Sequence, residues 1–413
     1  MRVCIHRGAH EIGGSCVEVG SDHDRIVLDL GRPLSAGWDD QVPLPEIVGL
    51  SRPDGRMHGV VLSHPHLDHY GLAGQLGEGV PVYLGEEASQ VLTAASFFSP
   101  VSRCPPLAGH LHDRVPLRLG PFTITPFLAD HSAFDAYSLL VEANGRRLFY
   151  TGDLRGHGRK ARLFDRLVAD APLVDVLLME GTHVRGSART APRSSEQSVE
   201  ADLVETFRAT TGMVATFSSA QNIDRLVTVY RAARRAGRIL VVDLYTATMA
   251  QATGRSTIPQ PGFDGFAVYV PWRQRRRVLQ TREFDRVAQI APIRLYPEDL
   301  ATERGKVAYL GTSSTAQELL DAGALHDGAV VWSMWDGYLT APAGLRMIKM
   351  LNDAAVPVIE HHTSGHASID DLQRLVAAFD PARVVPIHSE ASHRYKDHFP
   401  RVDQHADGTW WEV

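Results

Sequence analysis

The sequence predicts an α/β protein with more than one domain, and three observations support this. A chain of 413 residues is too long for one ordinary hydrophobic core. Before residue 188, short β-branched runs alternate with turn residues, which is typical of a layered, sheet-rich domain with few helices. After residue 195, strands alternate with amphipathic helices, which is typical of a parallel sheet.

The first part of the chain contains a series of apolar runs with the length of single strands. Asn144-Gly145 is a typical two-residue hairpin turn between two of them. The predicted strands are Arg2–His6, Ser15–Val19, Arg25–Leu30, Gly59–Ser63, Val80–Leu84, Phe122–Leu128, Tyr137–Glu142, Arg147–Tyr150 and Val174–Met179.

A polar stretch that contains proline, Ala188–Ser195, predicts a domain boundary. Ser195 is a candidate N-cap for a helix that continues to about Thr211. The further predicted helices are Asn222–Ala236 and Ile369–Phe379, and the further predicted strands are Met213–Phe217, Arg238–Asp243, Lys306–Leu310, Ala329–Ser333, Val356–Glu360 and Arg383–Ile387.

Composition limits the compartment and the partners. No stretch approaches the roughly 20 apolar residues that a membrane-spanning helix needs, so we expect no membrane contact. The first residues have the pattern of a strand and not of a signal peptide, and three scattered cysteines argue against a disulfide framework. We therefore expect a cytoplasmic protein. A net charge of −6 gives no overall attraction to a polyanion, so any nucleic-acid contact requires local basic patches.

The strongest chemical signal is Ser63-His64-Pro65-His66-Leu67-Asp68-His69, directly after a predicted strand. Imidazoles and carboxylates are the ligands that Zn²⁺ or Mn²⁺ accept in an open catalytic site. One turn cannot aim all four side chains at a single point. His64 and His66 point one way and Asp68 and His69 the other, which favours two ions that share a site.

Two ions need further ligands, and three candidates follow other predicted strands. These residues are His131, Asp153 and His388. Singly, each has an ordinary alternative, a surface or core histidine or a carboxylate that caps a turn. Their shared position at the ends of strands favours one common metal site.

These residues resemble the signature of the metallo-β-lactamase superfamily in ligand type and order, on residues 64–69, His131 and Thr151-Gly152-Asp153. Later motifs are similar to those of one branch, the β-CASP nucleases, which include ribonuclease J. The matching segments are the acidic motif Leu178–Thr182, the paired histidine motifs His361–Ser368 and Pro386–Glu390, and Phe217–Arg225, which is similar to a phosphate-contacting turn.

The resemblance implies a four-layer αββα metallo-β-lactamase fold with an inserted α/β β-CASP domain. The implied ranges are 1–193 for the N-terminal part of the first domain, 194–361 for the β-CASP cap and 362–413 for the C-terminal part of the first domain. We expect a catalytic cleft between the first domain and the cap. The chain resembles ribonuclease J without its additional C-terminal domain.

The resemblance also implies two zinc ions, with manganese as the alternative metal. The implied ligands are His64, His66 and His131 for one ion, Asp68, His69 and His388 for the other, and Asp153 as the bridge. A hydroxide held by the ions would attack phosphorus, and His366, kept protonated by Glu180, would be the general acid. The implied catalytic residues are Asp68, Glu180 and His366, and the implied substrate-binding residues are Ser218, Ser219, Arg225, Ser364 and Ser368.

The expected partner is RNA, with single-stranded DNA as the alternative. RNA-processing members of the family resemble this chain in having a histidine where His388 stands. Basic residues also follow the proposed ligands and form a dense run beside Trp272, which could stack on a base or anchor a loop. They are Arg155, Arg159, Lys160 and Arg162, then Arg185, Arg189 and Arg193, and in the cap Arg273, Arg275, Arg276 and Arg277.

Several alternatives remain open. The chain could be a ribonuclease J-like exonuclease or endonuclease, or a DNA-directed β-CASP nuclease. A small-molecule metallo-hydrolase of the superfamily would lack the cap, and an inactive nucleic-acid scaffold would lack ligands. On the residues alone, Glu180 could be an ordinary strand-end carboxylate and His366 an imidazole that only binds phosphate. The oligomeric state is open between a monomer and a dimer.

Overall fold

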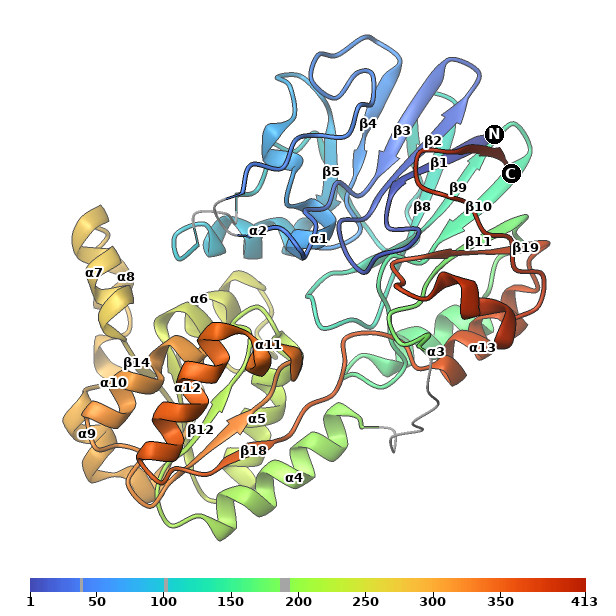
Figure 1. Ribbon diagram of the computed structural model, residues 1–413. Coiled ribbons are helices and arrows are strands. Elements are labelled where there is room, and N and C mark those ends of the chain that lie inside the picture. Colours follow the sequence, from blue (N-terminus) through green and yellow to red (C-terminus); the bar gives the residue numbers. More distant parts are fainter. Residues whose placement is uncertain (38–39, 100–102, 186–193) are drawn as a thin grey trace. The chain divides into compact units, whose positions relative to one another are not determined.

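The strands of the protein pair into three sheets that belong to two separate units (Figure 1). Unit 1 comprises residues 1–193 and 365–413, and unit 2 comprises residues 194–364. The structure is a computed structural model that describes every residue except 38–39, 100–102 and 186–193. Most of the predicted boundary segment, residues 188–193 with Arg189 and Arg193, therefore lies outside the described residues.

Unit 1 contains two mixed sheets. The first has the order β20-β1-β2-β3-β4-β5-β6. Its strands are β1 (Arg2–Arg7), β2 (Cys16–Ser21), β3 (Asp24–Leu28), β4 (Met57–Val61), β5 (Val82–Gly85), β6 (Gly109–Leu111) and β20 (Trp410–Glu412). The second has the order β19-β11-β10-β9-β8-β7. Its strands are β7 (Leu117–Leu119), β8 (Phe122–Leu128), β9 (Tyr137–Ala143), β10 (Arg146–Tyr150), β11 (Val176–Glu180) and β19 (Arg383–Ile387).

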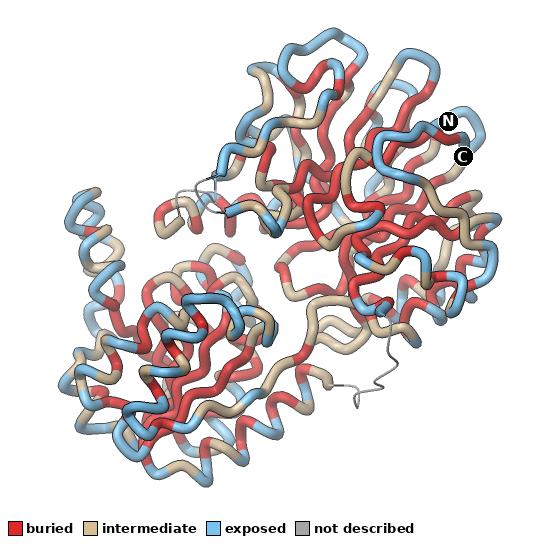
Figure 2. The backbone as a smooth tube through the Cα atoms, viewed as in Figure 1, coloured by how far each residue is buried: buried red, intermediate tan, exposed pale blue. Residues whose placement is uncertain are grey.

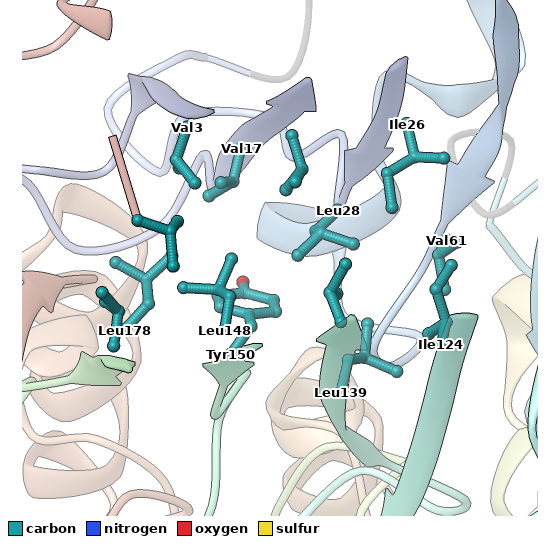
Figure 3. Packing of buried hydrophobic residues seen from close by; sticks show 14 of the residues in the cluster. Val3, Val17, Ile26, Leu28, Val61, Ile124, Leu139, Leu148, Tyr150 and Leu178 are labelled. Carbon is teal, nitrogen blue, oxygen red and sulfur yellow. The ribbon is translucent and has the colours of Figure 1, made fainter. Parts of the chain in front are cut away.

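The two sheets of unit 1 pack face to face and enclose its main hydrophobic core (Figure 3). Side chains alternate between the two faces of a strand, so every second residue of each strand points into this core. One sheet contributes Val17, Ile26 and Leu28, and the other contributes Leu139 and Leu148.

Helices cover the outer faces of both sheets of unit 1. Helices α1 (Leu67–Tyr70) and α2 (Glu86–Ala95) contribute Tyr70, Ala88 and Leu92 to a cluster with residues of the first sheet. Helices α3 (Ala161–Ala169) and α13 (Ile369–Phe379) contribute Phe164, Leu167, Leu372 and Leu375 to a cluster with the second sheet. The layer order is therefore helix, sheet, sheet, helix, which confirms the predicted αββα class.

Unit 2 is built around a sheet in which every neighbouring pair of strands is parallel. Its order is β15-β14-β13-β16-β12-β17-β18. The strands are β12 (Val214–Phe217), β13 (Ile239–Asp243), β14 (Phe266–Tyr269), β15 (Arg294–Leu295), β16 (Val307–Gly311), β17 (Ala329–Trp332) and β18 (Val358–Glu360). Figure 2 shows these strands buried and the surrounding helices buried on one side only, as expected for an α/β layer arrangement.

The helices of unit 2 connect these parallel strands. They are α4 (Glu196–Ala209), α5 (Ile223–Arg235), α6 (Leu244–Ala252), α7 (Trp272–Thr281), α8 (Asp285–Ala288), α9 (Pro297–Thr302), α10 (Ala316–Asp321), α11 (Gly337–Thr340) and α12 (Pro342–Asp353). Helices α5 and α6 contact β13 and β16. Helices α9, α10 and α12 contribute Leu300, Leu319 and Met347 to a cluster with Val241 and Tyr309 of the sheet.

Sequence patterns located most strands but fewer of the helices. Phe122–Leu128, Ile369–Phe379 and Arg383–Ile387 are confirmed to the residue, and Ser195 caps α4 by accepting a hydrogen bond from the backbone of Ser198. The sequence patterns did not separate some elements. These are helices α2 and α3 and the elements between residues 266 and 302. No helix in the described part of the chain is both long and apolar enough to cross a bilayer.

Candidate metal centre

The candidate metal ligands follow the carboxyl ends of strands that run in the same direction. In the second sheet, β8 and β10 are both antiparallel to β9, and β11 and β19 continue parallel to β10. Their carboxyl ends therefore meet at one edge, where His131, Asp153 and His388 lie close together in space. In the first sheet, β4 leads into the turn that carries His64 to His69.

The first group of ligands consists of three histidines, His64, His66 and His131. Their ring nitrogens lie within 4.8 Å of one another. Nε2 of His131 is 3.1 Å from Nδ1 of His66. His64 and His131 are fully buried. Three converging imidazoles form a ligand set typical of an open zinc site.

The second group contains two histidines and two carboxylates, Asp68, His69, Asp153 and His388. Oδ2 of Asp153 is 3.1 Å from Nε2 of His69 and 3.8 Å from Nε2 of His388. The same oxygen is 3.7 Å from Nε2 of His64 in the first group. Asp153 is therefore the residue whose carboxylate reaches both groups.

The ring nitrogens that point away from the centre are held by hydrogen bonds. Nδ1 of His131 donates to the carbonyl of Gly365 at 2.6 Å, and Nδ1 of His69 donates to Oδ2 of Asp29 at 2.7 Å. Nδ1 of His388 is 3.0 Å from the hydroxyl of Thr182. Such outer bonds fix the ring orientation and leave Nε2 as the ligand atom.

Three buried polar atoms at the centre show that these residues suit bound metal. Nε2 of His64, Nε2 of His69 and Oδ1 of Asp153 have no hydrogen-bond partner among the described residues. Burial of polar atoms without partners is costly, whereas coordination to a cation removes that cost. The donor set of imidazoles and carboxylates suits zinc or manganese.

His69 differs in its pKa from the three histidines of the first group. Burial lowers the pKa of His64 and His131 well below the usual value, and burial lowers that of His66 to about 4. These rings are thus neutral at pH 7, which is the form that binds metal. Burial also lowers the pKa of His69, but the surrounding carboxylates, Asp153 foremost, outweigh burial and raise it well above its usual value.

His366 lies beside the second group and contacts Glu180. Its Nδ1 is 3.6 Å from Oε1 of Glu180 and 3.1 Å from the hydroxyl of Thr182. Burial lowers the pKa of His366, but the carboxylates of Asp153 and Glu180 outweigh burial and raise it to about 9. Glu180 is held in place by the backbone N–H groups of Thr182 and Ala367, each at 3.0 Å.

The backbone at two of the strand ends adopts the left-handed conformation. His388 has a φ of +52°, which is uncommon for a residue other than glycine. Gly152 also has a φ of +52°, and a Cβ there would lie 3.1 Å from Cβ of Ser63. Glycine is therefore required before Asp153, and strained residues of this kind concentrate at functional sites.

Comparison with known proteins agrees with this geometry. Residues 36–215 match the sequence model of the beta-lactamase superfamily domain, and residues 357–399 match that of the Zn-dependent metallo-hydrolase RNA specificity domain. The chain belongs to the metallo-β-lactamase superfamily. It carries, in addition, the RNA specificity region that accompanies β-CASP domains, which confirms the resemblance stated from the sequence.

Relatives of this metallo-β-lactamase superfamily member are distant. Ribonuclease J of Sinorhizobium meliloti is 22% identical over 369 residues, which cover 85% of this chain and 61% of that protein. Transcription termination factor FttA of Methanosarcina mazei is 25% identical over 272 residues, covering 59% and 41%. Probable RNase MJ4 of Methanocaldococcus jannaschii is 25% identical over 202 residues, covering 44% and 46%. The chain thus spans less than two thirds of the length of these relatives.

A solved structure shares the whole fold. It is the crystal structure of a protein of unknown function from Enterococcus faecalis V583, with a TM-score of 0.80 and 20% sequence identity. The two chains cover 99% of each other. At this identity the likeness concerns the fold alone.

The residues predicted to bind substrate are distributed over both units of this superfamily member. Ser218, Ser219, Arg225 and Ser364 belong to unit 2, and Ser368 belongs to unit 1. Arg225 is fully buried, where it pairs with Glu196. Ser368 is the N-cap of α13 and accepts a hydrogen bond from the backbone of Asp371 at 3.1 Å. Roles of these five residues in substrate binding stay predictions.

One part of the predicted basic patch proves to be internal. Arg155 was expected among the basic residues that contact RNA, but it is fully buried and contacts Asp130, the residue before His131. Lys160 donates to the backbone carbonyls of His131 and Ala133. The expectation is wrong for Arg155 because the chain is still buried two residues after Asp153.

Two residues around the centre were not identified from the sequence. Asp29 accepts hydrogen bonds from Nδ1 of His69, from the hydroxyl of Ser63 and from the hydroxyl of Tyr150 at 2.6 Å. The hydroxyl of Thr182 contacts Nδ1 of both His366 and His388. Asp29 lies inside the predicted strand Arg25–Leu30, whereas β3 ends at Leu28, so a search of the predicted strand ends would not have found it.

Proposed function

We propose that the protein is a phosphodiesterase that hydrolyses RNA with the help of two divalent metal ions. The observation that carries the proposal is the pair of ligand groups joined by Asp153, because one carboxylate oxygen is within 3.8 Å of ligand nitrogens from both groups. The ions, when bound, would supply an activated water molecule and offset the negative charge on the phosphate.

The ligands of each ion follow from the two groups. One ion would be held by His64, His66 and His131, the other by Asp68, His69 and His388, and both by Asp153. Asp68 has a direct neighbour in the second group, with Oδ2 3.3 Å from Nε2 of His388. Zinc and manganese both suit these donors, so the preferred metal is part of the test below.

His366 and Glu180 supply the proton for the leaving group in this proposal. The Nδ1 side of the His366 ring faces Glu180 and Thr182, so Nε2 is the atom that would give a proton to the departing ribose oxygen. Because Glu180 is fully buried and fixed by two backbone N–H groups, its negative charge stays next to the imidazole. A positioned acid of this kind contributes about 10²- to 10⁴-fold to a rate.

RNA is the proposed substrate because of the comparisons. The RNA specificity domain match covers residues 357–399, which include both His366 and His388. Ribonuclease J is among the relatives aligned over most of this chain. Single-stranded DNA of the same sequence is the matched comparison substrate in the experiment.

The experiment incubates end-labelled RNA and matched single-stranded DNA with the protein after chelation and after return of zinc or manganese. We expect cleavage of RNA that disappears with chelation and returns with metal, at about two ions per chain. Cleavage that persists in metal-free protein would exclude the proposal.

His366→Gln should retain the bound metal but lose turnover by about 10²-fold or more. The control His326→Gln changes an exposed histidine of unit 2 and should be fully active.

A further inference from the structure

Exposed aromatic side chains gather at one edge of the parallel sheet of unit 2. Six aromatic residues are exposed among the described residues, Trp272, Phe284, Tyr296, Trp335, Tyr338 and Trp410, and all but Trp410 belong to unit 2. Tyr296 directly follows β15, Trp272 follows β14, and Trp335 and Tyr338 follow β17. Since all strands are parallel, these four aromatic residues lie at the carboxyl edge of the sheet.

About half of the surface of each of these four residues is exposed to solvent. Trp272 is 54% exposed, Trp335 and Tyr338 are each 53% exposed, and Tyr296 is 49% exposed. Single exposed aromatic residues are common on protein surfaces, whereas several along one edge of a sheet indicate an interaction surface. Trp335 and Tyr338 also contact each other edge to face, with ring centroids 5.4 Å apart.

The aromatic residues flank a polar centre on the same edge. Two of them follow β15 and β14 on one side, and the other two follow β17 on the other side. Between them lie β13, β16 and β12. The hydroxyl-rich segment Thr312–Thr315 follows β16, and Ser218–Ser219 follows β12. Four strand spacings separate β14 from β17, which is about 19 Å. This distance suits an extended ligand and not a single small molecule.

The polar centre is the place where a parallel sheet most often binds a ligand. The strands β12 and β16 are neighbours. The chain leaves β12 towards β13 and leaves β16 towards β17, and these two strands lie on opposite sides of the pair. Ligands bind at such a switch point, at the carboxyl ends of the strands. Ser218 is 2% exposed, and its buried hydroxyl has no hydrogen-bond partner among the described residues. It is therefore available to a group that enters there.

Arginine side chains accompany the aromatic rings. The guanidinium of Arg276 lies 5.4 Å from the ring centre of Trp272, and that of Arg294 lies 4.6 Å from the ring centre of Tyr296. Arg273 is exposed next to Trp272. In a chain with a net charge of −6, this local positive charge favours an anionic ligand. Aromatic faces, arginines and hydroxyl groups together are the contacts that single-stranded nucleic acids make with proteins.

We propose that the carboxyl edge of the unit 2 sheet binds single-stranded RNA, with bases stacked on Trp272, Tyr296, Trp335 and Tyr338. The phosphates would be bound by the hydroxyl-rich segments after β12 and β16. The proposal rests on the proposed function for the choice of RNA. It adds that recognition is by stacking and is independent of base sequence, since every base offers a flat face.

Binding is tested with the metal-free full chain, so that cleavage does not interfere. The probes are a fluorescent oligouridylate, an abasic oligomer of equal length and an RNA duplex, with anisotropy as the readout. The wild type should bind the oligouridylate more tightly than either other probe. Trp335→Ala together with Tyr338→Ala, or Trp272→Ala alone, should weaken binding of the oligouridylate by about 5- to 150-fold.

Two control variants keep this test decisive. Trp335→Phe retains a stacking face and should bind within a few-fold of the wild type, which separates stacking from misfolding. Trp410→Leu changes an exposed aromatic residue of unit 1 and should bind like the wild type. Equal binding of the alanine variants and the wild type, or equal binding of the abasic oligomer and the oligouridylate, would overturn the proposal.

Two further results separate this proposal from the proposed function. If the wild type cleaves RNA and the alanine variants bind RNA as well as the wild type does, the stacking proposal is wrong and the proposed nuclease function stands. If binding depends on the aromatic residues but no metal-dependent cleavage occurs, the stacking proposal stands and the proposed nuclease function is wrong. Binding of vesicles that contain anionic lipid, lost in the alanine variants while RNA binding is unchanged, would assign the edge to a lipid surface and overturn the proposal.

Discussion

A buried polar cluster lies in each unit, and the two differ in how their polar atoms are satisfied. In unit 2, the guanidinium of Arg225 donates to both carboxylate oxygens of Glu196, at 3.2 and 3.0 Å, and to the carbonyl of Ser333 at 2.9 Å. In unit 1, atoms of His64 and Asp153 are equally buried but have no hydrogen-bond partner among the described residues. The cluster of unit 2 is thus complete by itself, whereas that of unit 1 has atoms that suit an added cation.

The comparison shows that burial of charged groups does not by itself identify a functional site. Both clusters carry a desolvation cost, although Glu196 and Arg225 of unit 2 lie on helices and the ligands of unit 1 follow strands. The difference is the presence of unpartnered atoms that converge on one point. Changes in the two clusters should therefore have opposite consequences for stability and activity.

The largest expected effect is loss of activity on removal of the shared ligand. Asp153→Ala should lower RNA cleavage by about a thousandfold or more, because both ions lose a ligand. The metal-free variant should unfold at about the same denaturant concentration as the metal-free wild type, because removal of the partnerless Oδ1 offsets loss of the contact between Oδ2 and His69. Kinetics, metal content and urea unfolding provide the measurement. A clear loss of metal-free stability would show that Asp153 is a structural residue.

The opposite behaviour is expected of Glu196. Glu196→Ala leaves Arg225 buried without its partner and should lower the free energy of unfolding by about 3–5 kcal/mol. The double variant Glu196→Leu with Arg225→Met should recover most of this loss, since apolar residues of similar size need no partner. Urea unfolding provides the measurement. The control is Asp353→Ala, which breaks an exposed pair with Lys349 and should change stability by less than about 1 kcal/mol.

A smaller effect is expected where an outer carboxylate orients a ligand. Asp29→Asn keeps the size of the side chain but weakens the hydrogen bond to His69, and should lower metal affinity about 10- to 100-fold. Competition with a chelator measures that affinity. Tyr150→Phe removes one donor to Asp29 and leaves the bond to His69, so its loss should be smaller. Equal losses in the two variants would contradict an orienting role.

The smallest effect concerns Ser368, which was expected to bind substrate. Its hydroxyl caps α13, so Ser368→Ala should lower the free energy of unfolding by about 1 kcal/mol. Ser195→Ala, at the N-cap of α4, is the matched change in unit 2 and should have a similar effect. If Ser368→Ala also weakens RNA binding while Ser195→Ala does not, then Ser368 has both roles.

Much of the candidate centre could be predicted because its signals are local. The turn from His64 to His69 holds four ligand-type side chains within six residues, and Asp153 and His388 each follow an apolar strand. Strand patterns also predicted a layered, sheet-rich domain, since the alternation of apolar residues is a local property, and the resemblance to the superfamily implied the αββα order. The short helices of unit 1 were harder to predict, because a helix such as α3 is formed by packing on the sheet as much as by its own residues.

The sequence alone determined which side chains can bind metal and where strands end, because residue type and turn geometry depend on near neighbours. Only the tertiary structure decided which of them meet, since the order of the strands brings Asp29 to His69 and Thr182 to His388. It also decided that Arg155 and Arg225 are internal while Trp272 and Trp335 are exposed. Whether a charged or aromatic residue faces solvent depends on contacts from distant segments, and a local pattern contains no information about these contacts.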